Sequence, residues 1–317
     1  MPSGRRVFIT GGAGFIGSRL ALRCMSANSV TIYDTFARGS ADLGDLDSHP
    51  NVTIVKGDVS DRAALESAMA GHDIVFHCAA VLGVTAVRLH PTKVLNVNVL
   101  GSASVLEAAT TIDALSRVVC FSSSEVYGVR AVNVKESDPT SIPATGDPRW
   151  SYAVSKLAEE HFAFAHHRET GLPISVVRPF NVYGPGQAGE GAIANFIRSA
   201  LKSDPLQVRG GGQHIRAWCF VDDMIDGALL AATRPEAVGE TFNIGNPWAV
   251  ETTLGLAQRV IGAVSTRSSI EHVAGVADVE ARTPDIAKAA RLLGYQPTVG
   301  LEDGINRSVA WFRENLS

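Results

Sequence analysis

Short apolar runs alternate with amphipathic stretches along the first half of the chain. The apolar runs are rich in β-branched and aromatic residues and predict strands at Arg6–Thr10, Val30–Asp34, Val52–Lys56, Asp73–His77, Arg117–Ser122 and Pro173–Arg178. Several of them are almost wholly apolar, as expected of strands buried on both faces of a parallel sheet. The stretches between them have helical periodicity and predict helices at Phe15–Ala27, Asp61–Ala70, Pro91–Thr111 and Ser151–Thr170. This alternation predicts a doubly wound, parallel α/β sheet.

The pattern of short strands and helices changes after Pro179. Glycine and proline cluster at Tyr183–Gly186 and Gly210–Gly212, and longer irregular segments separate the expected helices. We therefore predict a first domain over residues 1–179 and a smaller α/β lobe over residues 180–317. Within the second half, about 215–245 is expected to return to the first domain, with Ala217–Thr233 packing on it.

The composition is that of a soluble globular protein. The chain has 317 residues, enough for two domains or one large one, of which 45% are hydrophobic and 19% charged. Its 28 lysines and arginines stand against 32 aspartates and glutamates, a net charge of −4, and no basic cluster indicates a nucleic-acid or membrane partner. No apolar run has the roughly 18 residues that a membrane span needs, so we expect a cytoplasmic protein.

The cysteines and histidines do not indicate a metal site. Cys24, Cys78, Cys120 and Cys219 are far apart, and each lies in or beside an apolar stretch. This distribution is typical of buried thiols in a reducing compartment rather than of zinc ligands.

The first predicted strand leads directly into a glycine-rich segment, TGGAGFIG. In such a segment Gly11, Gly14 and Gly17 would allow a tight turn, close approach to a pyrophosphate and close packing of the next helix. Phe15 and Ile16 open that helix, where the positive end of the helix dipole favours an anion. The strand, loop and helix together predict a Rossmann-type dinucleotide site.

An acidic residue follows at the spacing that this site requires. Asp34 ends the second strand twenty residues after Gly14, where its carboxylate can accept the ribose hydroxyls of adenosine. A carboxylate there would repel a 2′-phosphate, which favours NAD as the cofactor. Arg38 leaves NADP as an alternative, because arginines bind that phosphate. Asp58 is a candidate for the adenine amine, with a simple turn residue as the alternative.

A second motif lies at the start of the last predicted helix. Tyr152 and Lys156 are four residues apart and share one helix face. An ammonium group beside a phenol favours the phenolate and would lower the tyrosine pKa from about 10 toward neutrality. A phenolate could then remove the proton of a sugar hydroxyl. A serine from Ser122–Ser124, after the fifth strand, could share this hydrogen bond.

These motifs together resemble the extended short-chain dehydrogenase/reductase family, in its nucleotide-sugar epimerase/dehydratase branch. The resemblance extends from about Arg6 to about Phe312, and besides Asp34 it rests on the segments TGGAGFIGS, GDVSD, FHCAA, NVNVLGS, SSSEVYG, YAVSK, RPFNVYGPG, RAWCFVDDM and RTPDIAKA. It implies NAD as the cofactor, a nucleotide sugar (preferably a UDP-sugar) as substrate, and a homodimer formed through the helices Pro91–Thr111 and Ser151–Thr170.

The resemblance also implies roles for single residues. Tyr152 would be the base, Lys156 would hold the nicotinamide ribose, and Ser123 would be the assisting hydroxyl. Further cofactor contacts are expected from Val59, Ala79 and Asn98. Substrate contacts are expected from the lobe and from one residue near the sugar pocket, namely Asn181, Asn195, Val208, Arg216, Arg282 and Arg88.

The reaction depends on two residues of the serine-rich loop. The family's shared chemistry is oxidation at sugar C4, a change in the 4-keto intermediate, and return of the hydride. Family dehydratases carry Asp and then Glu in this loop, whereas here Ser124 stands in place of the Asp and Glu125 is retained. Ser124 and Glu125, taken with Arg216, resemble the UDP-glucuronate decarboxylases. A purely structural carboxylate is the alternative for Glu125.

We predict an NAD-dependent nucleotide-sugar 4-epimerase that uses Tyr152 as base. Decarboxylation or dehydration through Glu125 is the alternative. A non-catalytic NAD-binding sensor is a third hypothesis. Such relatives usually lose the tyrosine, the lysine or the glycines, and all of these are present here.

Overall fold

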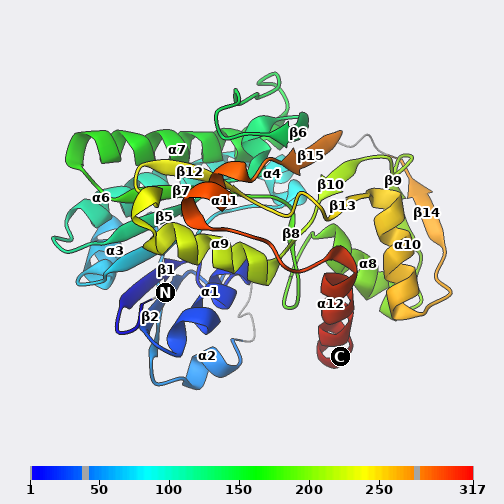
Figure 1. Cartoon of the computed structure of the whole chain (residues 1–317), viewed down its shortest axis with the longest axis horizontal. Coiled ribbons are helices and arrows are strands. Elements are labelled where there is room, and N and C mark those ends of the chain that lie inside the picture. The colour runs from blue at the N-terminus through cyan, green and yellow to red at the C-terminus, as the bar shows by residue number, and fades with distance from the viewer. Residues whose placement is uncertain (1, 38–42, 275–278, 317) are drawn as a thin grey trace.

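The computed structural model describes residues 2–37, 43–274 and 279–316. Within these residues the largest sheet has seven strands and only parallel pairings (Figure 1). In spatial order they are β12 (Glu240–Ile244), β7 (Ile174–Pro179), β5 (Arg117–Phe121), β4 (Ile74–His77), β1 (Arg6–Thr10), β2 (Ser29–Asp34) and β3 (Val52–Lys56). The predicted doubly wound α/β fold is confirmed.

The order of the strands reverses between β1 and β4. The chain builds β1, β2 and β3 outward in one direction and then crosses back to place β4 on the other side of β1. In open α/β sheets, ligands bind at such a reversal, beyond the carboxyl ends of the strands. The loops that follow β1, β4 and β5 therefore meet at the edge where a cofactor site is expected.

Helices cover both faces of this sheet (Figure 1). One layer contains α3 (Arg62–Met69), α6 (Gly101–Thr110) and α7 (Ser151–Thr170). The other contains α1 (Phe15–Met25), α9 (Val221–Thr233) and α11 (Ala287–Leu293). The strands β4 and β5 are buried along their whole length, because each face carries a helical layer.

The helix predicted at Pro91–Thr111 is interrupted in the structure. It consists of α5 (Pro91–Leu95), a π-helical turn at Asn96–Leu100, and α6. Such turns occur frequently at functional sites, because the widened turn redirects a side chain. The π-turn here carries the buried Asn98.

The chain returns to the large sheet after it has left it. β12 pairs with β7 in parallel, from Glu240 opposite Ser175 to Ile244 opposite Pro179. The helix α9, which precedes β12 in the chain, packs on β5 and β7.

A second, smaller lobe lies beside the carboxyl end of the sheet (Figure 1). Its four-stranded sheet runs in the order β13 (Val250–Thr252), β10 (Ile215–Ala217), β15 (Ala281–Pro284) and β6 (Arg130–Val134). The last of these strands comes from the segment between β5 and α7. Three helices pack on one another in this lobe, namely α8 (Ala192–Leu201), α10 (Thr253–Val264) and α12 (Leu301–Asn315).

The remaining elements are short. Two further parallel pairs join β8 (Val182–Tyr183) to β11 (Cys219–Phe220) and β9 (Leu206–Arg209) to β14 (Ile270–Val273). The short helices are α2 (Asp45–Ser48) and α4 (Val84–Leu89). Among the described residues, no helix has both the length and the apolar character needed to traverse a bilayer.

The contact between the glycine loop and α1 gives a stability prediction. A Cβ at Gly17 would lie 2.2 Å from the carbonyl oxygen of Gly11, so Gly17→Ala must displace the loop or the helix. We expect a loss of about 1–3 kcal/mol in the free energy of unfolding, measured by urea denaturation.

The matched control is Gly262→Ala in α10, because a Cβ there would meet no described atom within 4 Å apart from its chain neighbours and the helix's own backbone. This variant should be as stable as the wild type or more stable by up to about 1 kcal/mol. Equal stability of Gly17→Ala and the wild type would contradict the proposed tight contact.

Candidate active site

The glycine loop joins the carboxyl ends of β1 and β4. Gly11 has a φ of +66°, and a Cβ there would lie 2.7 Å from the backbone nitrogen of Ala79. Gly14 is the N-cap of α1, so Phe15 and Ile16 form its first turn. The loop is thus a glycine cradle at the positive end of a helix dipole, which is suited to a pyrophosphate.

Asp34, at the end of β2, is hydrogen-bonded to the glycine loop. Its carboxylate accepts hydrogen bonds from the backbone N–H groups of Ala13 at 3.1 Å and Phe36 at 2.9 Å. Arg38, the residue that leaves NADP as an alternative cofactor, lies outside the described residues.

The other predicted cofactor residues differ in their surroundings. The Asp58 carboxylate accepts hydrogen bonds from the N–H and hydroxyl of Ser60, at 2.9 and 2.8 Å, so it stabilises a local turn. Val59 is buried in the core beneath α3 and α6. The buried Asn98 side chain bonds both backbone groups of Val81, at 2.7 and 3.0 Å.

Tyr152, Ser123 and Lys156 come together beyond the carboxyl end of β5. The Ser123 hydroxyl lies near enough to the Tyr152 phenol to lower its pKa as a hydrogen-bonding neighbour, and Lys156 lowers it as a nearby positive charge. Ser122, by contrast, donates its hydroxyl to Glu160 at 2.5 Å. Ser123 is therefore the loop serine that meets the tyrosine.

The expected lowering of the Tyr152 pKa is wrong for this structure. Burial raises the pKa of Tyr152 above its ordinary value, although Lys156 acts in the lowering direction. The negative charges of Glu125 and Glu159 add to the rise. Desolvation of the phenolate thus outweighs the nearby ammonium group.

Lys156 has a carboxylate partner that the sequence motif does not include. Its Nζ lies 2.6 Å from Oε2 of Glu159, and both side chains are almost completely buried. The next residue, Glu160, forms a second buried pair with Arg178 at 2.7 Å. Helix α7 therefore presents a row of charges to the sheet, each compensated by an opposite charge.

Glu125 lies between two arginines. Its Oε1 is 2.5 Å from Nη1 of Arg282, and its Oε2 is 2.9 Å from Nη1 of Arg149. The two guanidinium groups outweigh the effect of burial and lower the pKa of Glu125 to about 2. Glu125 is therefore ionised at neutral pH and acts on Tyr152 as a negative charge.

Arg216 completes this group, which we call the arginine cluster (Arg149, Arg216 and Arg282 around Glu125). Arg216 on β10 is opposite Arg282 on β15 in the parallel register. Its guanidinium donates to the backbone carbonyls of Val279 and Ile215, and burial and Arg282 lower its pKa to about 10. Among the described residues, these three guanidinium groups lie around a single carboxylate.

The other predicted substrate residues make contacts within the protein. The Asn181 amide donates to the Ala217 carbonyl at 2.9 Å, and Asn195 accepts from Arg198 at 3.0 Å on the exposed face of α8. The Val208 side chain is fully buried in β9 and packs in the core, and the predicted substrate contact of this residue stays a prediction. Arg88 lies on the exposed side of α4.

Comparison with known proteins fits this geometry. Residues 7–245 match the model of the NAD dependent epimerase/dehydratase family. The chain belongs to this family. It is 34% identical to the UDP-N-acetyl-alpha-D-glucosaminuronate decarboxylase of Bacillus cytotoxicus, over 98% of each chain. It is 32% identical to UDP-glucuronic acid decarboxylase 1 of Danio rerio, over 98% of this chain and 73% of the relative.

A solved structure of the family is also similar over the whole chain. The UDP-glucuronic acid 4-epimerase of Bacillus cereus, in complex with UDP-glucuronic acid and NAD, has a TM-score of 0.89 and 28% identity. The match covers 98% of this chain and 99% of the epimerase. The protein is thus an NAD-dependent enzyme of the epimerase/dehydratase family, as the resemblance implied.

The site fits NAD. The cradle at Gly11 and Gly17 leaves no space for a side chain, and Asp34 stands at the end of β2, where the family's cofactor ribose is expected. Asn98 and Ala79 shape the neighbouring loop through backbone contacts with Val81 and Gly11.

Sequence reasoning missed several charged residues of this family member's site. Glu159 follows Lys156 at helical spacing i, i+3, and this spacing could have indicated the pair. Arg149 carries no such local signal. Its contact with Glu125 depends on how the η2 turn (Ser124–Tyr127) faces the η3 turn (Pro148–Trp150), and no local pattern encodes that arrangement.

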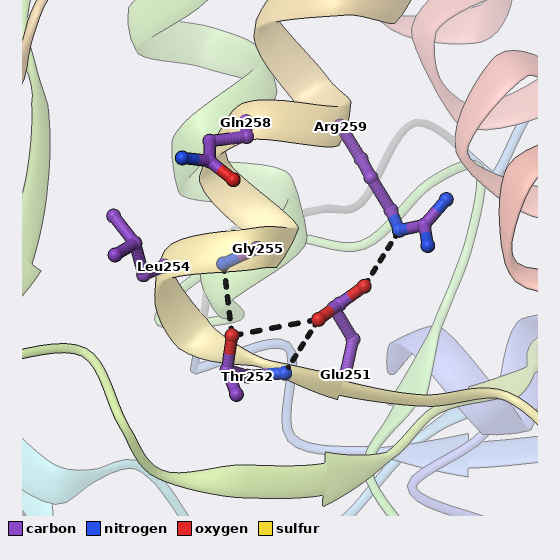
Figure 2. A pocket seen from close by; sticks show the side chains of 6 residues that line it. All are labelled: Glu251, Thr252, Leu254, Gly255, Gln258 and Arg259. Carbon is purple, nitrogen blue, oxygen red and sulfur yellow. Dashed lines mark hydrogen bonds and ion pairs between the residues drawn. The ribbon is translucent and has the colours of Figure 1, made fainter.

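The smaller lobe has a hollow at the start of α10 (Figure 2). Figure 2 shows interactions among four of its lining residues, Glu251, Thr252, Gly255 and Arg259. Glu251 is 2.7 Å from Arg259, and the Thr252 hydroxyl accepts from Gly255 N at 3.0 Å as the cap of the helix. These contacts stabilise the helix start, and we assign the hollow no ligand.

The ion pairs of Glu125 give a pH-dependent stability prediction. Because the folded-state pKa of about 2 lies below the ordinary value of 4.5, the stabilisation is complete above pH 4.5 and is lost toward about pH 2. Glu125→Gln should lower the free energy of unfolding by a few kcal/mol at neutral pH.

The difference in the free energy of unfolding between Glu125→Gln and the wild type should shrink as the pH falls from 4.5 toward about 2. It is measured by urea denaturation at each pH at which the wild type is folded. The control Glu66→Gln breaks the exposed pair with Arg62 and should cost at most about 1 kcal/mol. A difference for Glu125→Gln that does not change with pH would show that the carboxylate charge is not responsible.

Proposed function

We propose that this enzyme binds a UDP-uronic acid and removes its carboxylate, as a UDP-uronate decarboxylase. The observation that supports this most directly is the arginine cluster beside Tyr152 and Ser123. Epimerisation at C4 needs only the tyrosine, lysine and serine, so the arginine cluster is a candidate for binding an anionic group of the sugar. The two curated relatives named above act on uronic acids in the same way.

The chemistry begins at C4 of the sugar. NAD, when bound, supplies the hydride acceptor and later the hydride donor. Tyr152 removes the proton of the C4 hydroxyl, with Ser123 sharing the hydrogen bond. The product of this step is a 4-ketone, which stands β to the C5 carboxylate.

The ketone makes loss of carbon dioxide possible. The bond between C5 and the carboxyl carbon breaks, its electron pair enters the enolate of the C4 ketone, and a proton from water then adds to C5. Glu125 is ionised and therefore does not donate this proton. We assign it to holding Arg149 and Arg282 in position, so that their guanidinium groups bind the carboxylate and stabilise the enolate.

The 4-epimerase predicted from the sequence is the second candidate. It is supported by the similarity to a UDP-glucuronic acid 4-epimerase and by the fact that Glu125 is already paired with two arginines. The epimerase predicted from the sequence is expected to take a UDP-hexose. With a UDP-uronic acid as substrate, the two candidates differ in whether the carboxylate survives.

Product analysis separates the two reactions. The purified enzyme with NAD is incubated with UDP-glucuronate, its N-acetylated analogue, UDP-glucose and dTDP-glucose, and the products are analysed by mass spectrometry. We expect loss of carbon dioxide from a UDP-uronic acid and no reaction with the neutral sugars. A product of unchanged mass with a new retention time would instead support the epimerase.

The Glu125→Gln variant tests the arginine cluster. We expect the decarboxylation rate to fall by about 100-fold or more, because the guanidinium groups lose their fixed position. Oxidation at C4, followed as NADH absorbance in a single turnover, should fall much less. Equal losses in both steps would contradict the assigned role. Glu66→Gln, on α3, is the control and should retain both rates.

We also propose a homodimer. The helices α5 and α7 and the π-turn between α5 and α6 carry exposed apolar side chains, namely Leu95, Leu100, Val154 and Phe162. These belong to the two helical segments through which the family resemblance implies a dimer.

Light scattering with size-exclusion chromatography tests this proposal. The wild type should have the mass of two chains, and Phe162→Glu should shift it toward one chain, because a charge would be buried in the contact. Exposed Trp248, in the other lobe, provides the control Trp248→Glu, which should not change the mass. A monomeric wild type would overturn the proposal.

A further inference from the structure

Lys156 is held by a carboxylate that lies beneath it on the same helix. The distance from Lys156 Nζ to Glu159 Oε2 is 2.6 Å, and the side chains are 2% and 0% exposed. Water cannot compensate either charge at this depth, so the two groups must compensate each other. The ammonium group on which Tyr152 depends is therefore not a lone positive charge.

Glu159 has a second oxygen that faces the same interior. Its Oε1 makes no hydrogen bond of standard geometry to a described residue. Burial raises the pKa of Glu159 to about 7, with Lys156 and the Ser102 hydroxyl opposing the rise. The carboxylate is thus poorly stabilised except through Lys156.

The elements packed around the pair contribute few other charges. The polar and titratable groups that face it are Tyr152 and Glu160 from α7, His77 from β4, Cys78 just after β4, Cys120 from β5 and Ser102 from α6. His77 is bonded on both ring nitrogens, to Thr10 and Ser102 at 2.8 Å each, and burial lowers its pKa to about 3, so it is neutral. Glu160 is compensated by Arg178.

We propose that Glu159 is a positioning residue for Lys156, which holds the ammonium group beneath Tyr152 and offsets part of its charge. Glu159 thereby sets how readily Tyr152 loses its proton. This inference rests on the proposed roles of Tyr152 and Lys156 in sugar oxidation. It follows from the same geometry that a neutral side chain at position 159 should make the phenolate easier to form.

A direct titration of the phenol tests this inference without a sugar substrate. The chain has 5 tyrosines, and the difference in ultraviolet absorbance between each protein and its Tyr152→Phe form isolates the Tyr152 phenolate. The NAD-bound enzyme is titrated as wild type and as Glu159→Gln. We expect the midpoint to move to lower pH in Glu159→Gln, on the order of one pH unit, because a nearby negative charge is removed.

Glu160→Gln is the matched control, because it removes the neighbouring buried carboxylate, whose partner is Arg178 rather than Lys156. It should reduce stability but move the Tyr152 midpoint much less than Glu159→Gln does, because Arg178 compensates the charge of Glu160. If Glu159→Gln does not fold, Glu159→Ser provides the second variant, since its smaller side chain leaves space for water beside Lys156. The same downward shift is expected.

An unchanged or higher midpoint in the Glu159 variant, or an equal shift in Glu160→Gln, would overturn the inference. The titration result for Glu159 and the substrate test of the proposed function can fail independently. A downward shift without any turnover of UDP-uronic acids would leave the role of Glu159 standing and reject the substrate. Decarboxylation of a UDP-uronic acid without the downward shift would support the substrate and reject the role of Glu159.

Discussion

The structure depends on the compensation of charges that helix α7 buries against the sheet. Lys156, Glu159 and Glu160 are all inaccessible to water, and an isolated charge there would cost several kcal/mol. The pairs Lys156–Glu159 and Glu160–Arg178 remove that cost. The second pair connects α7 to β7 and, through the Ser122 hydroxyl, to the loop after β5. The loop after β5 and helix α7 are therefore fixed by one network.

The same burial determines the chemistry of the site. A phenol in this environment resists ionisation, so Lys156 alone does not make Tyr152 a ready base. On the other side of Tyr152, Glu125 stays ionised because Arg149 and Arg282 hold it. A compensated cation, Lys156, thus lies near the tyrosine, and Glu125 with the arginine cluster lies near it as well.

The sequence predicted the elements that follow local rules. Six strands of the large sheet, the glycine loop and the Tyr152–Lys156 face depend on apolar periodicity and on spacing within one element, and they lie where they were expected. The interruption of the helix at Asn96–Leu100 depends on a buried side chain that contacts Val81, which is distant from it in sequence. The arginine cluster joins residues more than a hundred positions apart, from β15, β10 and two short turns. Spacing along the chain carries no such information.

The identity of the product at C5 tests the central claim most directly. The enzyme can be incubated with NAD and UDP-glucuronate in deuterated water and the product examined by nuclear magnetic resonance. If the arginine cluster promotes loss of the carboxylate, the product will be a UDP-pentose that carries one solvent deuteron at C5 and the original hydrogen at C4. A product that retains its carboxylate and has no deuterium would contradict decarboxylation and assign the cluster to binding alone.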